Sequence, residues 1–194
     1  MHWSICDFIA DIAHNALHAE PTHVEIVIEQ SAHTLLLTVS DDGQGMSSEQ
    51  QKRAVDPFYS DRRHHPDRKV GLGLPMLIQT VESTGGTFRL ISSEGTGTTV
   101  ATEFSLDNID TPPIGDVAGT FCSLMGYAPG PELTIQRCYS TEHTPQREFY
   151  LRRSELIEAI GDLSNVETLG MLHKYIQSQE DWVKGDTNHG TNEP

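Results

Sequence analysis

The sequence predicts a mixed α/β protein, because helix-like and strand-like stretches follow one another along its first half. Apolar residues recur at helical spacing over residues 3–19, and Pro21 closes that stretch. Residues 23–30 instead alternate between apolar and polar side chains, which is typical of a half-buried strand. A more continuously apolar stretch at residues 34–40 predicts a second strand, which runs directly into Asp41.

Caps and turn residues predict the remaining elements of the first half. Ser47 or Ser48 is expected to cap a short helix that ends near Val55, and residues 56–73 are expected to form a long polar loop. A further helix and two strands are expected at residues 74–83, 87–93 and 98–106.

Thr-Pro-Pro at residues 111–113 marks a joint. Beyond it we expect a helix, a hairpin and two further helices, at residues 115–125, 133–139 with 148–151, 152–161 and 166–179. Apolar stripes on the last two helices are more often core than interface, although partner docking stays open. The expected organisation is a first domain, a small α+β extension and a disordered polar tail, at residues 1–110, 111–183 and 184–194.

The composition excludes several classes of protein. The chain of 194 residues carries 28 acidic and 13 basic residues, for a net charge of −15, which argues against nucleic acid and anionic membranes as partners. The three cysteines are odd in number and far apart in the sequence, so neither a disulfide scaffold nor a CxxC metal site is expected. The N-terminus has no signal-peptide pattern, so a cytoplasmic location is expected. His14 and His18 have metal-pair spacing, but a packed or solvated pair is the favoured interpretation.

Positive charge is concentrated in one segment. Six of the seven basic residues in the first 110 positions lie between Lys52 and Lys69. This segment is bounded by two glycine-rich motifs, DDGQGM at residues 41–46 and GLGLP at residues 71–75. A basic loop between glycine hinges suits a polyphosphate ligand.

Four short motifs occur in a fixed order: DIAHN, DDGQG, GLGL and GTGT, at residues 11–15, 41–45, 71–74 and 95–98. The set resembles the ATP-binding domain shared by histidine kinases, gyrase, heat-shock chaperones of the ninety-kilodalton class and mismatch-repair ATPases, the GHKL superfamily. The resemblance covers residues 3–106. It implies the Bergerat fold, an α/β two-layer sandwich whose mixed, largely antiparallel sheet carries helices on one face.

The resemblance implies a role for each motif. Asp11 would be the catalytic carboxylate that activates water, and Asn15 would bind Mg²⁺ through its amide oxygen. Asp41 would accept a hydrogen bond from the adenine amine, with Thr98 helping through water. The other implied nucleotide-binding residues let the backbone approach the base or bind phosphate, and they are Gly43, Gly45, Met46, Lys69, Gly71, Leu72, Gly73 and Leu74.

Within the superfamily, the chain most resembles stand-alone bacterial histidine-kinase-like ATPases often encoded beside iron-only hydrogenase subunits. The predicted first helix of the ATP-binding domain begins at residue 3, which leaves no room before it for a phospho-accepting helical hairpin. A self-contained sensor kinase is therefore not expected. Two functions stay open. One is a regulatory ATP- and Mg²⁺-binding protein whose ATP-ordered lid controls an unidentified protein partner, and a partner linked to redox enzymes or hydrogenase is the class that the resemblance suggests. The other is a weak ATPase, or a protein kinase acting on a separate partner. Asp11 stands where the family usually has Glu, and this shorter acid favours the regulatory protein.

Overall fold

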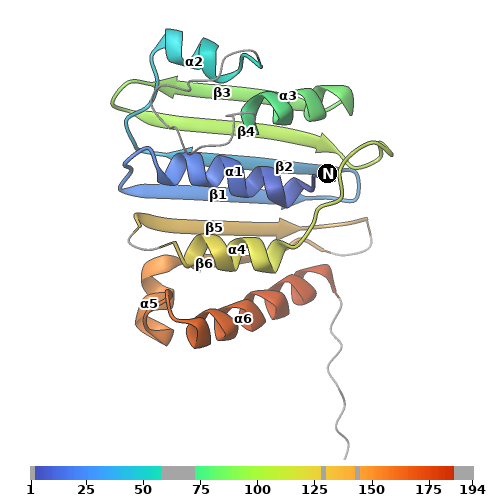
Figure 1. Cartoon of the computed structure of the whole chain (residues 1–194). Helices are drawn as coiled ribbons and strands as arrows, with labels where there is room; N and C mark the ends of the chain where they lie inside the picture. The colour runs from blue at the N-terminus through green and yellow to red at the C-terminus, as the bar shows by residue number, and fades with distance from the viewer. Residues whose placement is uncertain (1–2, 58–72, 128–129, 143–144, 186–194) are drawn as a thin grey trace, which may run out of the picture.

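A computed structural model describes residues 3–57, 73–127, 130–142 and 145–185 of the chain (Figure 1). Its centre is a six-stranded sheet in the order β3-β4-β2-β1-β5-β6. The strands are β1 (His23–Gln30), β2 (Thr34–Asp41), β3 (Thr87–Ser93), β4 (Gly97–Ser105), β5 (Glu132–Tyr139) and β6 (Arg147–Arg152). Every neighbouring pair is antiparallel except β1 and β5, which run parallel.

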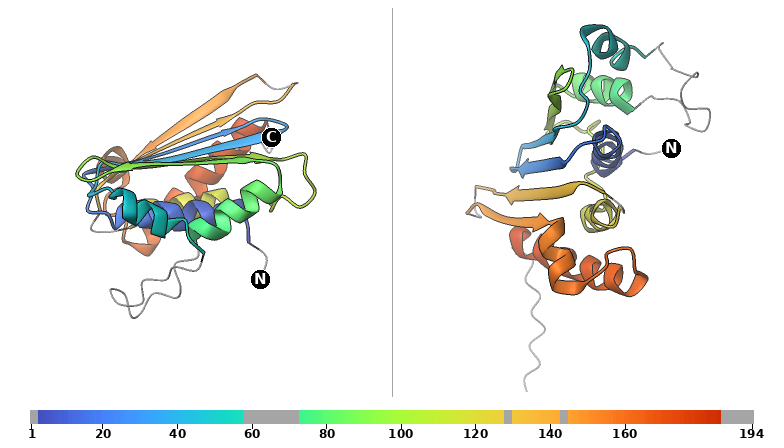
Figure 2. Two further views of the ribbon diagram at one scale, coloured as in Figure 1. Left: turned by 90° about the horizontal axis from the view of Figure 1, so that it is seen from above. Right: turned by 90° about the vertical axis from the view of Figure 1, so that its left-hand side faces the viewer.

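The described helices pack mainly on one face of this sheet. They are α1 (Ile5–Leu17), α2 (Ser48–Ala54), α3 (Gly73–Ser83), α4 (Val117–Met125), α5 (Arg153–Ile160) and α6 (Val166–Lys184). Figure 2 shows α1, α3 and α4 side by side against the sheet, and α6 packs against α4. The mixed, largely antiparallel sheet with helices on one face confirms the predicted fold class.

Local sequence explains where the first two helices begin. At α1, the Ser4 hydroxyl accepts a hydrogen bond from the Asp7 backbone amide, and the Asp7 carboxylate accepts one from the Ser4 amide in return. Ser47 and Gln50 form the same capping box at α2. Each box satisfies backbone amides that would otherwise lack partners at the helix start.

Alternation along the strands separates a buried face from an open one. Val24, Ile26 and Ile28 of β1 are fully buried against the helices. Leu36, Ile91 and Tyr150 alternate with residues that face the helices, and all three are exposed on the opposite face. Two-layer packing accounts for this pattern, because no described helix covers that second face.

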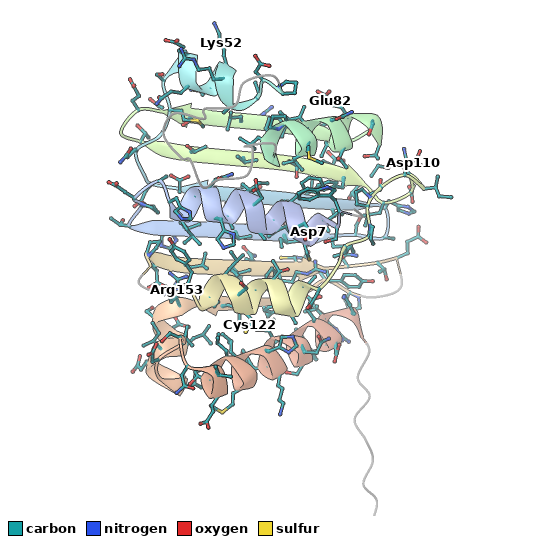
Figure 3. The ribbon with its side chains drawn as sticks, viewed as in Figure 1. Asp7, Lys52, Glu82, Asp110, Cys122 and Arg153 are labelled. Atoms are coloured by element: carbon teal, nitrogen blue, oxygen red, sulfur yellow. The ribbon has the colours of Figure 1, made fainter. Side chains whose placement is uncertain are left out.

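Residues 111–183 continue the same sheet and core. β5 pairs with β1 along its whole length, from His23 opposite Glu132 to Gln30 opposite Tyr139. Figure 3 labels Arg153 at the start of α5, where its guanidinium donates hydrogen bonds to the carbonyl oxygens of Leu124 and Pro131. The expected joint at residues 111–113 lies in the connection between β4 and α4.

Some boundaries differ from expectation. The last helix extends to Lys184 rather than ending at residue 179, because the polar Glu180 is buried there beside Arg137. Of the tail predicted to be disordered, residues 186–194 lie outside the described residues. Among the described helices, none combines the length and apolar character that crossing a membrane requires.

Candidate functional site

A cavity of about 550 Å³ lies between α1, α3 and the adjoining ends of β2 and β4. Its walls bring together eight residues that the motifs single out: Asp11, Asn15, Asp41, Gly45, Met46, Gly73, Leu74 and Thr98. Gly43 is not among the residues that line the cavity, but it packs closely on one that does, since a Cβ there would lie 2.3 Å from the Ala19 carbonyl oxygen. Lys69, Gly71 and Leu72 fall outside the described residues.

Asp41 forms one end of the cavity, where β2 stops. Its Oδ1 accepts a hydrogen bond of 2.9 Å from the Gly43 amide, and the residue faces Thr98 across the β2–β4 pair. Partial burial raises the pKa of the Asp41 carboxyl, and the Gly43 and Thr98 amides oppose that rise. A half-buried carboxylate of this kind favours a ligand that donates a hydrogen bond.

Ser92 on β3 ties the surrounding backbone together. Its hydroxyl accepts a hydrogen bond from the Met46 amide, donates one to the Gly97 carbonyl oxygen and lies 2.9 Å from the Thr98 hydroxyl. Gln51 of α2 donates from its side-chain amide to the carbonyl oxygens of Met46 and Ser92. The start of the segment after Met46 is therefore fastened to the Asp41 end of the cavity.

Two glycines permit the backbone to approach closely here. Gly45 has φ +64°, and a Cβ at this position would lie 1.9 Å from the Ser93 carbonyl oxygen. Gly97 has φ +105°, and a Cβ there would lie 1.9 Å from the Asp41 carbonyl oxygen. Any side chain at either position would push the strand ends apart and change the shape of the cavity.

Asp11 and Asn15 form the other polar group of the cavity, one turn apart on α1. Asn15 donates its side-chain amide to Asp11 Oδ2 at 3.3 Å, so the amide oxygen of Asn15 is the atom left to bind a cation. The start of α3 meets the same carboxylate, because a Cβ on Gly73 would lie 1.7 Å from Asp11 Oδ2. The first backbone amides of a helix attract anions, so this group suits a ligand that carries negative charge and a divalent cation.

His14 and His18 also line the cavity, and sequence reasoning gave them no role there. Both imidazole rings contact the ring of Tyr127, at centroid distances of 6.3 and 5.7 Å. Among the described residues, no group of three or more potential metal ligands comes together. Tyr127 follows α4, so no spacing in the sequence could have linked it to these histidines.

The volume and lining residues of the cavity fit a nucleotide. Apolar side chains of Val39, Leu90 and Val100 line the wall around Asp41, which suits a flat base with an exposed amine. The Asp11 carboxylate, the Asn15 side-chain amide and the start of α3 at Gly73 lie together, and this arrangement suits phosphates and a hard cation. The volume lies within the range of small-molecule sites, roughly 300–1,000 Å³.

Comparison with known families gives a match to one described as "Histidine kinase-, DNA gyrase B-, and HSP90-like ATPase", over residues 4–108. That segment contains every motif quoted above and all the strands and helices that line the cavity.

Curated relatives match over about half of the chain or less. The heme sensor protein HssS of Staphylococcus saprophyticus is 37% identical over 81 residues, which are 42% of this chain and 17% of that protein. Sporulation kinase B of Bacillus subtilis is 28% identical over 102 residues, which are 51% of this chain and 23% of the kinase. The sensor histidine kinase ZraS of Escherichia coli is 29% identical over 87 residues, 44% of this chain and 18% of ZraS. The matched region thus spans less than a quarter of each of these relatives.

Proposed function

Because the chain belongs to the histidine kinase-, DNA gyrase B-, and HSP90-like ATPase family, we propose that it binds ATP with Mg²⁺ and uses the bound nucleotide to control a protein partner. The observation that carries this proposal is the single cavity that brings Asp41 together with Asp11 and Asn15. The direct test is to measure the binding of ATP to the isolated protein by calorimetry, with and without Mg²⁺.

Each end of the cavity has a proposed role. Asp41 accepts a hydrogen bond from the exocyclic amine of adenine, and Val39 and Val100 contact the faces of the base. Asn15 would hold Mg²⁺ through its amide oxygen, and the cation would supply charge neutralisation for the phosphates. Gly73 and Leu74, at the start of α3, lie beside Asp11 and would offer backbone amides to the same phosphates.

The proposed control acts through the segment at residues 47–70, which begins with α2. Gln51 joins α2 to the backbone at Met46 and Ser92, next to the proposed adenine end. A ligand that contacts this backbone can therefore alter how α2 is held. Residues 58–70 of the proposed lid lie outside the described residues. A redox enzyme or hydrogenase component is the proposed class of partner, and co-purification with mass spectrometry from the native host tests it.

A weak ATPase, or a protein kinase acting on a separate partner, is the second candidate function. One specific observation favours it, namely that the Asp11 carboxylate lies in the cavity beside Asn15, where it could accept a proton from an attacking water or hydroxyl. The two candidates differ in turnover rather than in binding.

Replacing Asp11 by Asn separates these functions. If Asp11 acts as a general base, we expect steady-state phosphate release to fall by about a hundredfold or more, with ATP affinity within about threefold of wild type. The Asn side chain has nearly the same shape, so the contact with Gly73 is kept. Tight ATP binding with no phosphate release or phosphotransfer in the wild-type protein would instead support the regulatory role.

Replacing Asn15 by Ala is expected to weaken ATP binding mainly when Mg²⁺ is present. The change removes the amide oxygen proposed to bind the cation, and we expect roughly a tenfold to hundredfold loss of affinity with Mg²⁺, as when a metal-site group is lost. Calorimetric titrations in Mg²⁺ and in EDTA measure the two affinities. An equal loss under both conditions would contradict the metal role.

ATP affinity is also expected to depend on pH through Asp41. The ionised carboxylate accepts the adenine amine, and burial raises the pKa of this group above its ordinary value. ATP affinity should therefore be at its maximum above the raised pKa and fall as the pH drops through it and the carboxylate is protonated. This loss of affinity should occur at a higher pH than the protonation of an ordinary aspartate would cause. Titrating ATP at a series of pH values tests this, with the Asp41→Asn variant as the control that lacks the titrating group.

A further inference from the structure

The long helix α6 carries large apolar side chains both on its buried side and on a side that is exposed to solvent. One side, formed by Thr168, Leu172, Ile176, Glu180 and Val183, is buried against the rest of the protein. A second row on the same helix stays exposed, and we call it the outer stripe: Met171, Tyr175, Ser178 and Trp182. Its three large side chains are 54%, 47% and 43% exposed, for Met171, Tyr175 and Trp182.

The outer stripe has the spacing of a helix–helix seam. Its residues follow one another at intervals of four, three and four, which places them along one line of an α-helix, as in a coiled coil. The row extends over about 16 Å at 1.5 Å per residue. Trp182 is held in place within it, because the Arg147 guanidinium lies 5.4 Å from the centre of its ring and also donates a hydrogen bond to the Trp182 carbonyl oxygen.

We propose that the outer stripe binds the outer stripe of a second copy of this chain, with the two α6 helices antiparallel about a two-fold axis. An axis that passes between positions 176 and 177 places Tyr175 opposite Ser178 of the partner subunit. The same axis places Met171 opposite Trp182 of the partner subunit, a favourable sulfur–aromatic contact. A two-fold interface must be complementary to itself, and the pairs Tyr175–Ser178 and Met171–Trp182, each formed twice, meet that requirement.

Charge along the edge of the stripe selects this orientation. Glu167, Lys174 and Asp181 follow one another at seven-residue intervals beside the stripe. In the antiparallel arrangement, Lys174 lies beside Asp181 of the partner subunit, and the two-fold axis forms this pair twice. In a parallel pair, Lys174 would instead face Gln179 of the partner subunit, with no charge to match.

The proposed interface lies away from the nucleotide cavity. Figure 1 shows α6 along the edge of the molecule beyond β6, whereas the cavity is formed by α1, α3 and the ends of β2 and β4. Association through α6 therefore leaves both cavities open. The inference does not depend on the proposed function, because far-UV circular dichroism can check the folding of each variant whether or not the chain binds ATP.

Sedimentation equilibrium of the full chain over a range of concentrations, at physiological salt, tests the proposal. We expect wild-type protein to form a reversible dimer, since salt screens the repulsion between two chains of net charge −15. Tyr175→Glu is expected to weaken dimerisation more than about tenfold, because it brings two carboxylates to the centre of the seam. Val166→Glu is the matched control, since Val166 is 83% exposed on the same helix but lies off the stripe, and its dimer should be unchanged.

A charge exchange tests the orientation. Lys174→Asp and Asp181→Lys, each alone, should weaken the dimer by about threefold to tenfold through like-charge contacts, and the double variant should restore it. Far-UV circular dichroism and ATP affinity should be unchanged in all these variants. A protein that stays monomeric at every concentration reached, or a dimer that Tyr175→Glu leaves intact, would overturn the proposal. A dimer disrupted by Tyr175→Glu but not restored by the charge exchange would overturn the antiparallel pairing.

Discussion

Replacing Asp41 by Asn is expected to weaken ATP binding by roughly 2–4 kcal/mol, because it replaces the acceptor for the adenine amine with a group that presents its own donor. The change keeps the size of the side chain and the hydrogen bond that its remaining oxygen can accept from the Gly43 amide. Loss of affinity therefore reports the polarity at this end of the cavity rather than a change in packing.

Isothermal titration calorimetry measures this loss, and the neighbouring acid supplies a matched control. Asp42 accepts hydrogen bonds from the Thr22 and His23 amides and does not line the cavity, so Asp42→Asn should leave ATP affinity within about twofold of wild type. The two substitutions are chemically identical and adjacent. Equal affinities for wild type and the Asp41→Asn variant would remove the adenine assignment.

Much of the candidate site could be predicted from local sequence. Asp11 and Asn15 are one helical turn apart, so the prediction of a helix over residues 3–19 already placed them on one face. Asp41 ends a strand whose apolar pattern is clear, and the glycines after it signal a close approach of backbone. These features depend on residues near one another in the chain, where periodicity and turn chemistry carry the information.

The parts that could not be predicted depend on contacts between distant segments. Ser92 is 46 residues from Met46, and its role appears only when β3 lies beside the turn after β2. Tyr127 reaches His14 and His18 through the packing of α4 against α1. The pattern of β5 predicted a strand, but nothing in it specified parallel pairing with β1, because that pairing is set by how the intervening elements fold.

The buried ion pair between β5 and α6 is the clearest example of such a distant contact. Arg137 is fully buried, and its Nε donates to Glu180 Oε1 at 2.8 Å. Its remaining donors reach the Cys138 carbonyl oxygen and the Gln30 side chain. Lys184, one turn after Glu180 on α6, adds a second cation 3.2 Å from the other carboxylate oxygen. Arg137 thus connects strands β1 and β5 to the last helix from inside the core.

Replacing Arg137 by Met is accordingly expected to lower the free energy of unfolding by about 3–5 kcal/mol, since it leaves the Glu180 carboxylate buried without its main partner. Equilibrium denaturation with urea measures this change. Lys184→Met is the control, because Lys184 is partly exposed and Arg137 still holds the carboxylate, so a loss below about 1 kcal/mol is expected.

The double variant Arg137→Met with Glu180→Leu distinguishes an unpaired charge from lost packing. Removing both charges while keeping apolar volume should recover most of the stability lost in the single variant, because no buried ion then remains without a partner. If the double variant is as unstable as Arg137→Met alone, the loss comes from the hydrogen bonds to Cys138 and Gln30 rather than from Glu180. If Arg137→Met itself is as stable as wild type, then α6 is held to the sheet by its apolar side alone, and Glu180 contributes nothing to the position of the helix.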